Sequence, residues 1–541
     1  MTTTPAGDRP SSVAATAAGG TPTPQYFSHR QIIVILFGVM AGMLLFALDQ
    51  GIVGTALPRI VSELGGLDKL SWVVTAYLLT STASTPLWGK VSDLYGRRLT
   101  YQVAIGIFLL GSALSGVSQN MPQLIGFRAL QGAGGGGLFS IALSIIGDVI
   151  PPRERGRYQG YFGAVFGVSS IAGPLLGGWF TDGPGWRWIF YVNLPVGAAA
   201  LVVTSIVLRM PVVRREHQID YLGAATIVAA VSCLLLYLNW RGNDYGWTEG
   251  GALALLGASI VLTGLFILIE RRTAEPILPM RLFRNRVFSI GNAFGFLAGV
   301  AMFGGIIFLP VYLQAVKGFS PTASGLALLP AIVGIFSTSI SSGRLITKTG
   351  RYKIYPTIGA AVLVAALLLL SRLAVGTPLW QVALYEYLFG AGLGFTMQTI
   401  VTAVQNAVDF RDLGAATSST TFFRQMGGSI GAAVFGAALA SRLTHHLSEA
   451  FARLGVRAGA GPGVNTNNVQ AIQHLAEPVK HVVLGAFANA MDDVFLIGVP
   501  FLVVAFVISL FLTEVPLRTR PGPGGSSPDG QVPADTLGAV Q

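Results

Sequence analysis

Three ionisable residues interrupt stretches of the sequence that are otherwise apolar enough to cross a membrane. Asp49 follows the apolar run Ile32–Ala47, Arg128 lies one turn into another apolar stretch, and Glu386 precedes three closely spaced glycines. A charged side chain is costly inside a bilayer, so such a residue usually faces a cavity or a partner and serves a function. Burial disfavours the charged form of a carboxylic acid. We therefore expect Asp49 to load and release a proton, with Arg128 as its partner.

Each of these residues also has a structural interpretation. Asp49 would be a structural acid if hydroxyl groups or backbone amides satisfied it in a packed bundle, and an intramembrane Arg accepts a carbonyl or water as partner as well as an acid. Glu386 is a second proton site, a contact for cationic substrates, or an acid solvated near the outer interface. The sequence leaves these possibilities for Glu386 open.

The composition indicates that these residues belong to a polytopic membrane protein. Of 541 residues, 52% are hydrophobic and only 11% are charged, whereas a soluble protein carries about 25% charged residues. Apolar runs of about 20 residues, the length that crosses a bilayer, recur along the chain. The single cysteine, Cys233, and six scattered histidines offer no metal-binding spacing. We expect no metal site and no bound cofactor.

Fourteen apolar stretches predict fourteen spanning helices. They lie at residues 31–57, 70–89, 99–118, 123–147, 158–181, 188–208, 219–240, 251–270, 286–313, 322–342, 353–373, 378–406, 412–440 and 488–513. An even number of spans places both termini on one side of the membrane.

The distribution of positive charge predicts which side that is. The net charge is +11, which in a soluble protein would favour nucleic-acid binding, but here the basic residues gather in alternate short loops. Such loops are typically cytoplasmic. We expect a multi-pass protein of the plasma (inner) membrane with both termini in the cytoplasm and no nucleic-acid partner. The loops include Lys90, Arg97, Arg98, Arg153, Arg155, Arg157, Arg344, Lys348, Arg351 and Lys353.

An internal repeat divides the chain into two halves. Gly89 and Gly96 are seven residues apart and are followed by basic residues, and Gly343 and Gly350 repeat that pattern. Duplicated bundles of this kind underlie many secondary transporters. We predict an N-half bundle at 31–208, two additional helices with linkers at 209–285, and a C-half bundle at 286–513 with an outer loop at 441–487. The compositions of 1–30 and 514–541 predict disordered cytoplasmic tails.

Four motifs carry a resemblance to a known family. In chain order they are Leu48–Pro58, Gly89–Arg98, Leu124–Gly132 and Gly173–Gly178. Together they resemble the signature motifs of the major facilitator superfamily, and the first is similar to that of its fourteen-helix drug:proton antiporters. The resemblance covers residues 31–513. It implies an all-α integral membrane protein with two pseudo-symmetric six-helix bundles and two additional central helices.

The resemblance also implies roles for particular residues. It places Asp49 and Arg128 in proton coupling, and it implies a conformational latch in which Asp93 meets the start of a C-half helix near Gly414. A carboxylate is favourable at a helix N-terminus, although Asp93 would otherwise be a solvated loop charge. The latch motif comprises Gly89, Asp93, Gly96, Arg97 and Arg98, and the antiporter motif comprises Gly173, Pro174, Gly177 and Gly178.

Two further expectations concern helix shape and the cavity. Pro174 predicts a break in its helix, with the nearby glycines allowing close packing at the bend. Polar residues in apolar stretches are expected to line a substrate cavity, although helix–helix hydrogen bonds are the commoner use of such amides. The predicted cavity residues are Gln131, Gln398, Gln405, Asn406 and Arg424.

These features predict a proton-driven exporter of amphipathic, often cationic drugs, dyes or antibiotics, with a monomer as the default state. The chain has no P-loop of the form GxxxxGK[ST], which disfavours an ATP-driven pump. It shows no nucleophile or metal arrangement typical of an enzyme. An exporter of a lipid, siderophore or other metabolite would share this architecture. A non-transporting membrane sensor would usually carry a folded soluble domain, for which neither tail has the composition.

Overall fold

The computed structural model describes residues 29–64, 70–150, 154–208, 220–240, 250–453 and 479–517, and the regular structure in these ranges is helical. Each of the fourteen predicted stretches contains helix. The helices are α1 (His29–Leu64), α2 (Leu70–Tyr95), α3 (Arg97–Gly116), α4 (Met121–Val149), α5 (Arg155–Asp182), α6 (Trp188–Tyr191), α7 (Asn193–Val207), α8 (Tyr221–Trp240), α9 (Gly250–Arg272), α10 (Arg286–Ala315), α11 (Pro321–Ala327), α12 (Leu329–Thr349), α13 (Ile354–Leu370), α14 (Leu379–Ala407), α15 (Leu413–Arg453) and α17 (Val479–Leu510), with short 3₁₀ turns η2 (Met280–Arg284) and η3 (Phe410–Asp412).

Many of these helices are suited to a bilayer. Eleven helical stretches among the described residues are long and apolar enough to cross a membrane. Side chains on their outer surfaces are apolar too: Leu253, Ile260 and Val261 of α9 are all exposed. Since apolar groups are unfavourable in water, such a surface is stable against lipid. The chain is therefore a multi-pass membrane protein.

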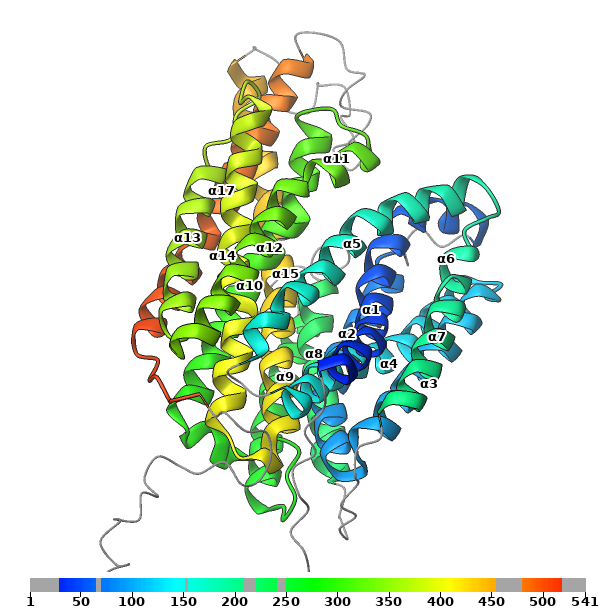
Figure 1. The fold of residues 1–541 in the computed structure, drawn as a ribbon. Coiled ribbons are helices and arrows are strands. Elements are labelled where there is room, and N and C mark those ends of the chain that lie inside the picture. The colour runs from blue at the N-terminus through cyan, green and yellow to red at the C-terminus, as the bar shows by residue number, and fades with distance from the viewer. Residues whose placement is uncertain are drawn as a thin grey trace, which may run out of the picture.

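The helices form two bundles, one made of α1 to α7 and the other of α10 to α17 (Figure 1). The bundles contact each other through α2 with α15 and through α5 with α12. They lean away from each other toward the end that carries α6 and α11 (Figure 1). Helices α8 and α9 pack together, and α8 also contacts α2 and α15, so the pair lies beside the junction of the two bundles.

Two glycines at equivalent places in the halves confirm the repeat in the backbone. Gly96, between α2 and α3, has a φ of 87°, and Gly350, between α12 and α13, has a φ of 72°. These positive φ values favour glycine because it has no Cβ. At these turns α2 and α12 end, and the chain reverses direction into α3 and α13.

Helices extend into the predicted loop between the last two spans. Helix α15 continues to Arg453 and α17 begins at Val479, so helix fills both ends of the predicted loop 441–487; residues 454–478 lie outside the described part, as do 1–28 and 518–541. The predicted tail also starts too early. The carbonyls of Val515 and Pro516 accept hydrogen bonds from Asn406, which holds this segment against the C half.

The predicted break at Pro174 is also wrong, because α5 is helical from Arg155 to Asp182 without interruption. A proline removes its own N–H donor and crowds one preceding carbonyl. Membrane helices tolerate this where neighbouring groups satisfy the freed backbone. The motif therefore acts through packing of a continuous helix.

Candidate functional site

Helix α4 forms the centre of the N-half bundle, because glycines bring it into backbone contact with its neighbours. Asn120 caps its start by accepting a hydrogen bond from Gln123 N–H. A Cβ at Gly132 would collide with the carbonyl of Tyr77 in α2, and one at Gly134 would collide with the backbone of Phe108 in α3. Small residues permit this close approach between membrane helices. Arg128 and Gln131 of α4 consequently lie in the interior of the bundle.

Asp49 and Arg128 form an ion pair in that interior. Arg128 Nη1 lies 2.5 Å from Asp49 Oδ2, and the side chains of Asp49 and Arg128 are 0% and 1% exposed. Gln131 donates to Asp49 Oδ1 at 2.8 Å and accepts from Arg128 Nη1 at 2.8 Å. The structure thus joins the acid and the arginine that the sequence paired, and adds Gln131 to both.

Further contacts hold Arg128 in place. Its guanidinium carbon lies 4.2 Å from the centre of the Tyr77 ring, and its Nε donates to the carbonyl of Val73 at 3.3 Å. A cation over an aromatic face is stabilised by the ring quadrupole. These two contacts with α2 therefore orient the arginine side chain in addition to its bond with Asp49.

Two members of the cluster were not predicted as site residues. Asn193, at the start of α7, donates to Asp49 Oδ1 at 3.3 Å, and both Asn193 and Gln131 donate to Ser112 Oγ of α3 at 3.0 and 3.2 Å. Ser112 in turn donates to the carbonyl of Phe190. The position of Asn193 beside an apolar run was a sequence signal for a site residue, whereas Ser112 carried no such signal. We call Asp49, Arg128, Gln131, Asn193 and Ser112 the carboxylate cluster.

The antiporter motif lies directly against this cluster. A Cβ at Gly173 of α5 would be 3.0 Å from Gly51 Cα of α1, two residues from Asp49. Gly177 accepts a hydrogen bond from Thr181, and a Cβ at Gly178 would meet open space. Gly173 is thus the member of the motif that allows α5 to touch the backbone of α1.

The latch motif connects the two halves at the opposite end of α2. Asp93 Oδ1 accepts from Gly414 N at 3.2 Å and its Oδ2 accepts from Ala415 N at 2.9 Å. These amides belong to the first turn of α15, where N–H groups have no partner within the helix. A carboxylate there gains both hydrogen bonds and a favourable interaction with the helix dipole. Asp93 therefore caps a C-half helix from the N half.

Arg97 pairs with the Asp93 carboxylate and also with a second acid that was not predicted as a site residue. It lies 2.6 Å from Asp93 Oδ1 and 2.6 Å from Asp148 Oδ2 at the end of α4. Gly89 packs against Ser418 of α15, where a Cβ would collide with the serine hydroxyl. Arg98, the next residue of the motif, is half-buried. Asp148 was missed because it is separated from the motif in sequence and meets it only through packing of α3 and α4.

The segment between α9 and α10 crosses the same junction. Lys90 of α2 lies 3.7 Å from Glu275, and Arg281 lies 2.8 Å from Asp412, which immediately precedes α15. Burial raises the pKa of Asp412, while the nearby Arg281 guanidinium opposes that rise. The additional helices are thus tied to both halves beside the latch.

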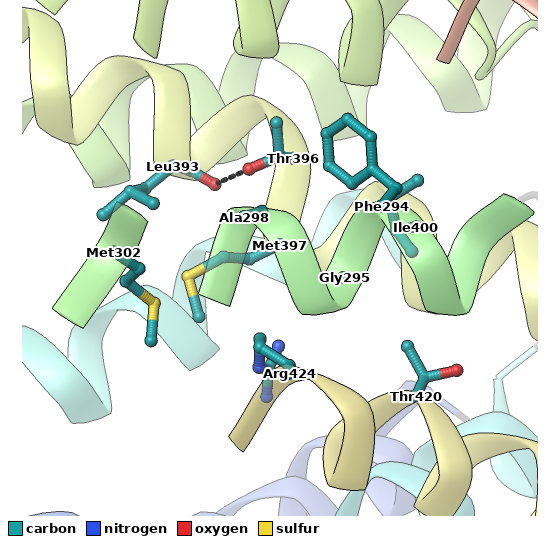
Figure 2. A pocket seen from close by; sticks show the side chains of 10 residues that line it. All are labelled: Phe294, Gly295, Ala298, Met302, Leu393, Thr396, Met397, Ile400, Thr420 and Arg424. Atoms are coloured by element: carbon teal, nitrogen blue, oxygen red, sulfur yellow. Dashed lines mark hydrogen bonds between the residues drawn. The ribbon is translucent and has the colours of Figure 1, made fainter. Parts of the chain in front are cut away.

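A pocket lies between α10, α14 and α15 (Figure 2). Of the five predicted cavity residues, Arg424 lines it. Gln405 instead donates to the carbonyl of Leu143 in the N half, Asn406 holds residues 515–516, and Gln398 is half-buried without a place in the lining. The amides of Gln131, Gln405 and Asn406 are engaged in hydrogen bonds within the protein, and their role in a substrate cavity stays a prediction.

Glu386 is buried, not solvated, being 1% exposed. Both of its carboxylate oxygens lack a hydrogen-bond partner among the described residues. It lies on α14 seven and eleven residues before Leu393 and Met397, which line the pocket. Residues at these intervals share one helix face. The solvated alternative for Glu386 is therefore excluded.

The sequence profile of the Major Facilitator Superfamily matches residues 39–432, which contain the carboxylate cluster and the latch. The chain belongs to this superfamily. Among its relatives in that superfamily is the multidrug transporter protein MdtP of Bacillus subtilis, 37% identical over 511 residues that cover 90% of this chain and 94% of that protein. Multidrug resistance protein 3 of Bacillus subtilis is 34% identical, covering 90% and 96%. The MFS-type transporter Rv1877 of Mycobacterium tuberculosis is 40% identical, covering 93% and 74%.

Solved structures of facilitators share the fold. The human organic anion transporter MFSD10 superposes with a TM-score of 0.58 at 15% identity, covering 88% of this chain and 99% of that one. A double Trp mutant of XylE gives a TM-score of 0.58 at 14% identity, covering 91% and 98%. At such identities the likeness concerns the fold alone. The transporter thus has a facilitator fold and multidrug transporters as sequence relatives.

Proposed function

We propose that this transporter is a proton-coupled multidrug efflux antiporter. It would cross the plasma membrane fourteen times, with both termini in the cytoplasm, and would exchange protons for amphipathic compounds by alternating access. The observation that carries the proposal is the carboxylate cluster: a fully buried Asp49 paired with Arg128 and bonded by two amides. The multidrug transporters among its relatives support the substrate class.

The chemistry of the cluster suits proton coupling. A proton on Asp49 Oδ2 removes the negative charge that faces Arg128 Nη1. Breaking one side of a buried ion pair costs about 3–5 kcal/mol, and about 5.5 kcal/mol moves a two-state equilibrium from 1:99 to 99:1. A single protonation is therefore large enough to change which conformation is populated. Gln131 and Asn193 retain the neutral acid in place by donating to its other oxygen.

The packing gives this change a route to the C half. Gly51, two residues after Asp49, touches Gly173 of α5, and α5 contacts α11 and α12 of the other bundle. A shift of α1 beside the cluster is thus passed to α5 and to the interface between the halves. The latch at Asp93 and α15 acts at the other end of that interface, holding the cytoplasmic side closed while the bundles part on the outer side.

Glu386 is proposed as a second proton-coupling residue. A buried carboxylate without a partner is much more stable as the neutral acid than as the anion, which suits a residue that takes up and releases a proton. Its position on the pocket-facing side of α14 lets exposure to solvent change when the halves rock. A proton gradient is then the energy source, and no bound cofactor is required.

The test uses everted vesicles that are energised to an acid interior. Wild type is compared with Asp49→Asn and with Asp409→Asn, which removes an exposed carboxylate between α14 and α15. Uptake of ethidium and the proton release it provokes are recorded together. Wild type and the Asp409 variant are expected to accumulate the dye and release protons, and Asp49→Asn to do neither. Uptake by Asp49→Asn at the wild-type rate would refute its role as proton carrier, and absence of both signals in wild type across several dyes would refute the drug assignment.

A further inference from the structure

The pocket between α10, α14 and α15 has one charge in an apolar wall. Its lining is formed by Phe294, Gly295, Ala298, Met302, Leu393, Thr396, Met397, Ile400, Thr420 and Arg424. Among these described residues Arg424 alone is charged. Figure 2 shows Arg424 and Thr420 on α15, opposite the α10 residues. The two threonine hydroxyls donate to carbonyls of their own helices. The pocket therefore presents a cation within an apolar surround.

Arg424 has no anion to balance it in the described part of the chain. It is 9% exposed, and its recorded interaction is with the face of Phe139 in α4, 5.3 Å from the guanidinium carbon to the ring centre. An aromatic face compensates part of a cation's lost hydration, but it leaves the guanidinium N–H donors without acceptors. A buried arginine usually has a carboxylate, carbonyl or water as partner. Arg128 in the N half has an acid and a carbonyl as partners, whereas Arg424 has neither among the described residues.

The backbone around Arg424 is fixed, so the side chain cannot withdraw from the pocket by a shift of its helix. A Cβ at Gly299 of α10 would collide with the Arg424 carbonyl, and a Cβ at Gly427 would collide with the Phe296 carbonyl. Glycines on both helices thus bring α10 and α15 into backbone contact at the arginine and three residues after it. The close packing holds a positive charge at the pocket wall next to the N half.

We propose that this pocket binds an amphipathic organic anion, whose carboxylate or sulfonate pairs with Arg424. The apolar body of the ligand would lie on Met302, Leu393 and Met397, and flexible methionines adapt to ligands of different shape. A guanidinium presents paired N–H donors that match the two oxygens of such an acid. A purely cationic ligand would meet repulsion from Arg424, whereas a zwitterion with a free acid group fits. The inference rests on the proposed export function and assigns this pocket to those of its substrates that carry an acid group.

The experiment compares ligands that differ only in the acid group. Purified transporter in phosphatidylcholine nanodiscs is titrated with rhodamine B and with rhodamine B ethyl ester by fluorescence polarisation, and with naphthoic acid and its ethyl ester by competition. Wild type is compared with Arg424→Gln, Arg424→Lys and Arg372→Gln, the last of which removes an exposed charge from the same half. Folding of each variant is checked by its elution profile and melting temperature.

Wild type and Arg372→Gln are expected to bind each acid at least about tenfold more tightly than its ester, the scale of one charge-assisted hydrogen bond. Arg424→Gln loses that preference with ester binding unchanged, and Arg424→Lys keeps part of it. Equal affinity of wild type for acid and ester, including no binding of either, overturns the proposal, as does a preference that survives in Arg424→Gln. Adding phosphatidylglycerol to the nanodiscs distinguishes two sources of the ligand. If the lipid abolishes the preference for acid over ester, the site binds an anionic lipid. If the preference persists, the site binds a solute.

The binding preference is separable from proton coupling. Asp49→Asn is expected to abolish export while the acid keeps its advantage in nanodiscs. If export fails in wild type but the preference depends on Arg424, the efflux function is wrong and the anion site stands. If export of cationic dyes succeeds and the preference is absent, the efflux function stands and the anion site is wrong.

Discussion

Removal of the charge on Asp93 should open the cytoplasmic side of the transporter. Asp93→Asn keeps the size of the side chain and one oxygen, but it loses the anion that accepts from Gly414 N and Ala415 N. Arg97 is not left unpaired by the change, because Asp148 lies 2.6 Å from it. The substitution therefore weakens the contact between the halves without creating a new buried charge.

The magnitude follows from the bonds that opening breaks. Arg97 is in the same half as Asp93, so their ion pair persists when the halves part, and only the contacts with α15 are lost. One charged hydrogen bond is worth about 1.5–3 kcal/mol, and a carboxylate at a helix N-terminus adds about 0.3–1 kcal/mol. The lower end of that sum is about 2 kcal/mol. At 1.4 kcal/mol per tenfold, the inward-open population should rise roughly 30-fold.

Cysteine labelling can measure this population. Ser418 is 1% exposed where Gly89 of α2 packs against α15, so a thiol at that position reacts only when the halves separate. We would introduce Ser418→Cys into a Cys233→Ser background, since Cys233 is the native thiol. The rate of maleimide labelling in everted vesicles, whose cytoplasmic face is accessible, is then compared with and without Asp93→Asn. An increase of at least tenfold is expected.

The matched control is Asp409→Asn, which removes an exposed carboxylate close to the start of α15. It should leave the labelling rate within about twofold of the parent, because an exposed charge contributes little. A rate in Asp93→Asn that stays within the same range, in protein with a normal elution profile, would refute the latch. An equal rise in the control would show that surface charge, and not the cap on α15, controls the reaction.

Two glycine substitutions test the geometry at other points, each against a matched glycine. Gly96→Ala should lower the melting temperature, because a φ of 87° is a strained conformation that costs a residue with a Cβ about 1–3 kcal/mol. The control Gly106→Ala in α3, where a Cβ meets nothing within 4 Å, should leave the melting temperature unchanged or raise it. A lower melting temperature for Gly106→Ala than for Gly96→Ala would contradict the assigned turn. Gly173→Val should reduce dye export at least about tenfold at normal membrane abundance, since its Cβ would press on Gly51 at 3.0 Å. Gly178→Val in the same motif should export normally, because a Cβ there meets open space. Equal export by the two variants would contradict the role given to the contact between α1 and α5.

Features that depend on local composition could be predicted from the sequence. The apolar runs located helix in all fourteen ranges, because a bilayer demands about 20 apolar residues in each span. The glycine spacing predicted the paired turns at Gly96 and Gly350, where positive φ excludes most other residues. Asp49 and Arg128 were detectable because each interrupts an apolar stretch, and the two are ion-paired in the structure.

Features that depend on packing between distant segments were not predictable in the same way. Ser112 and Asn193 join the cluster only because α3 and α7 pack beside α1 and α4. Gln405 has the same polarity as a cavity residue, yet it bonds to Leu143 across the two halves. Glu386 presented three alternatives that differ only in its surroundings, and its burial removed one of them. A single sequence does not show which of its residues become neighbours in the fold.

Helix α4 explains how a proton site and a latch far apart can belong to one cycle. It carries Arg128 of the carboxylate cluster near its start and Asp148, the partner of Arg97, at its end. Twenty residues of helix span about 30 Å, and glycines bring α4 into close backbone contact with both α2 and α3. Since α3 begins at Arg97 and α2 carries Asp93, we expect a displacement of α4 in the proposed proton cycle to displace the groups that cap α15 as well. In the proposed function, the energy of one proton would thereby be available at both ends of the N half.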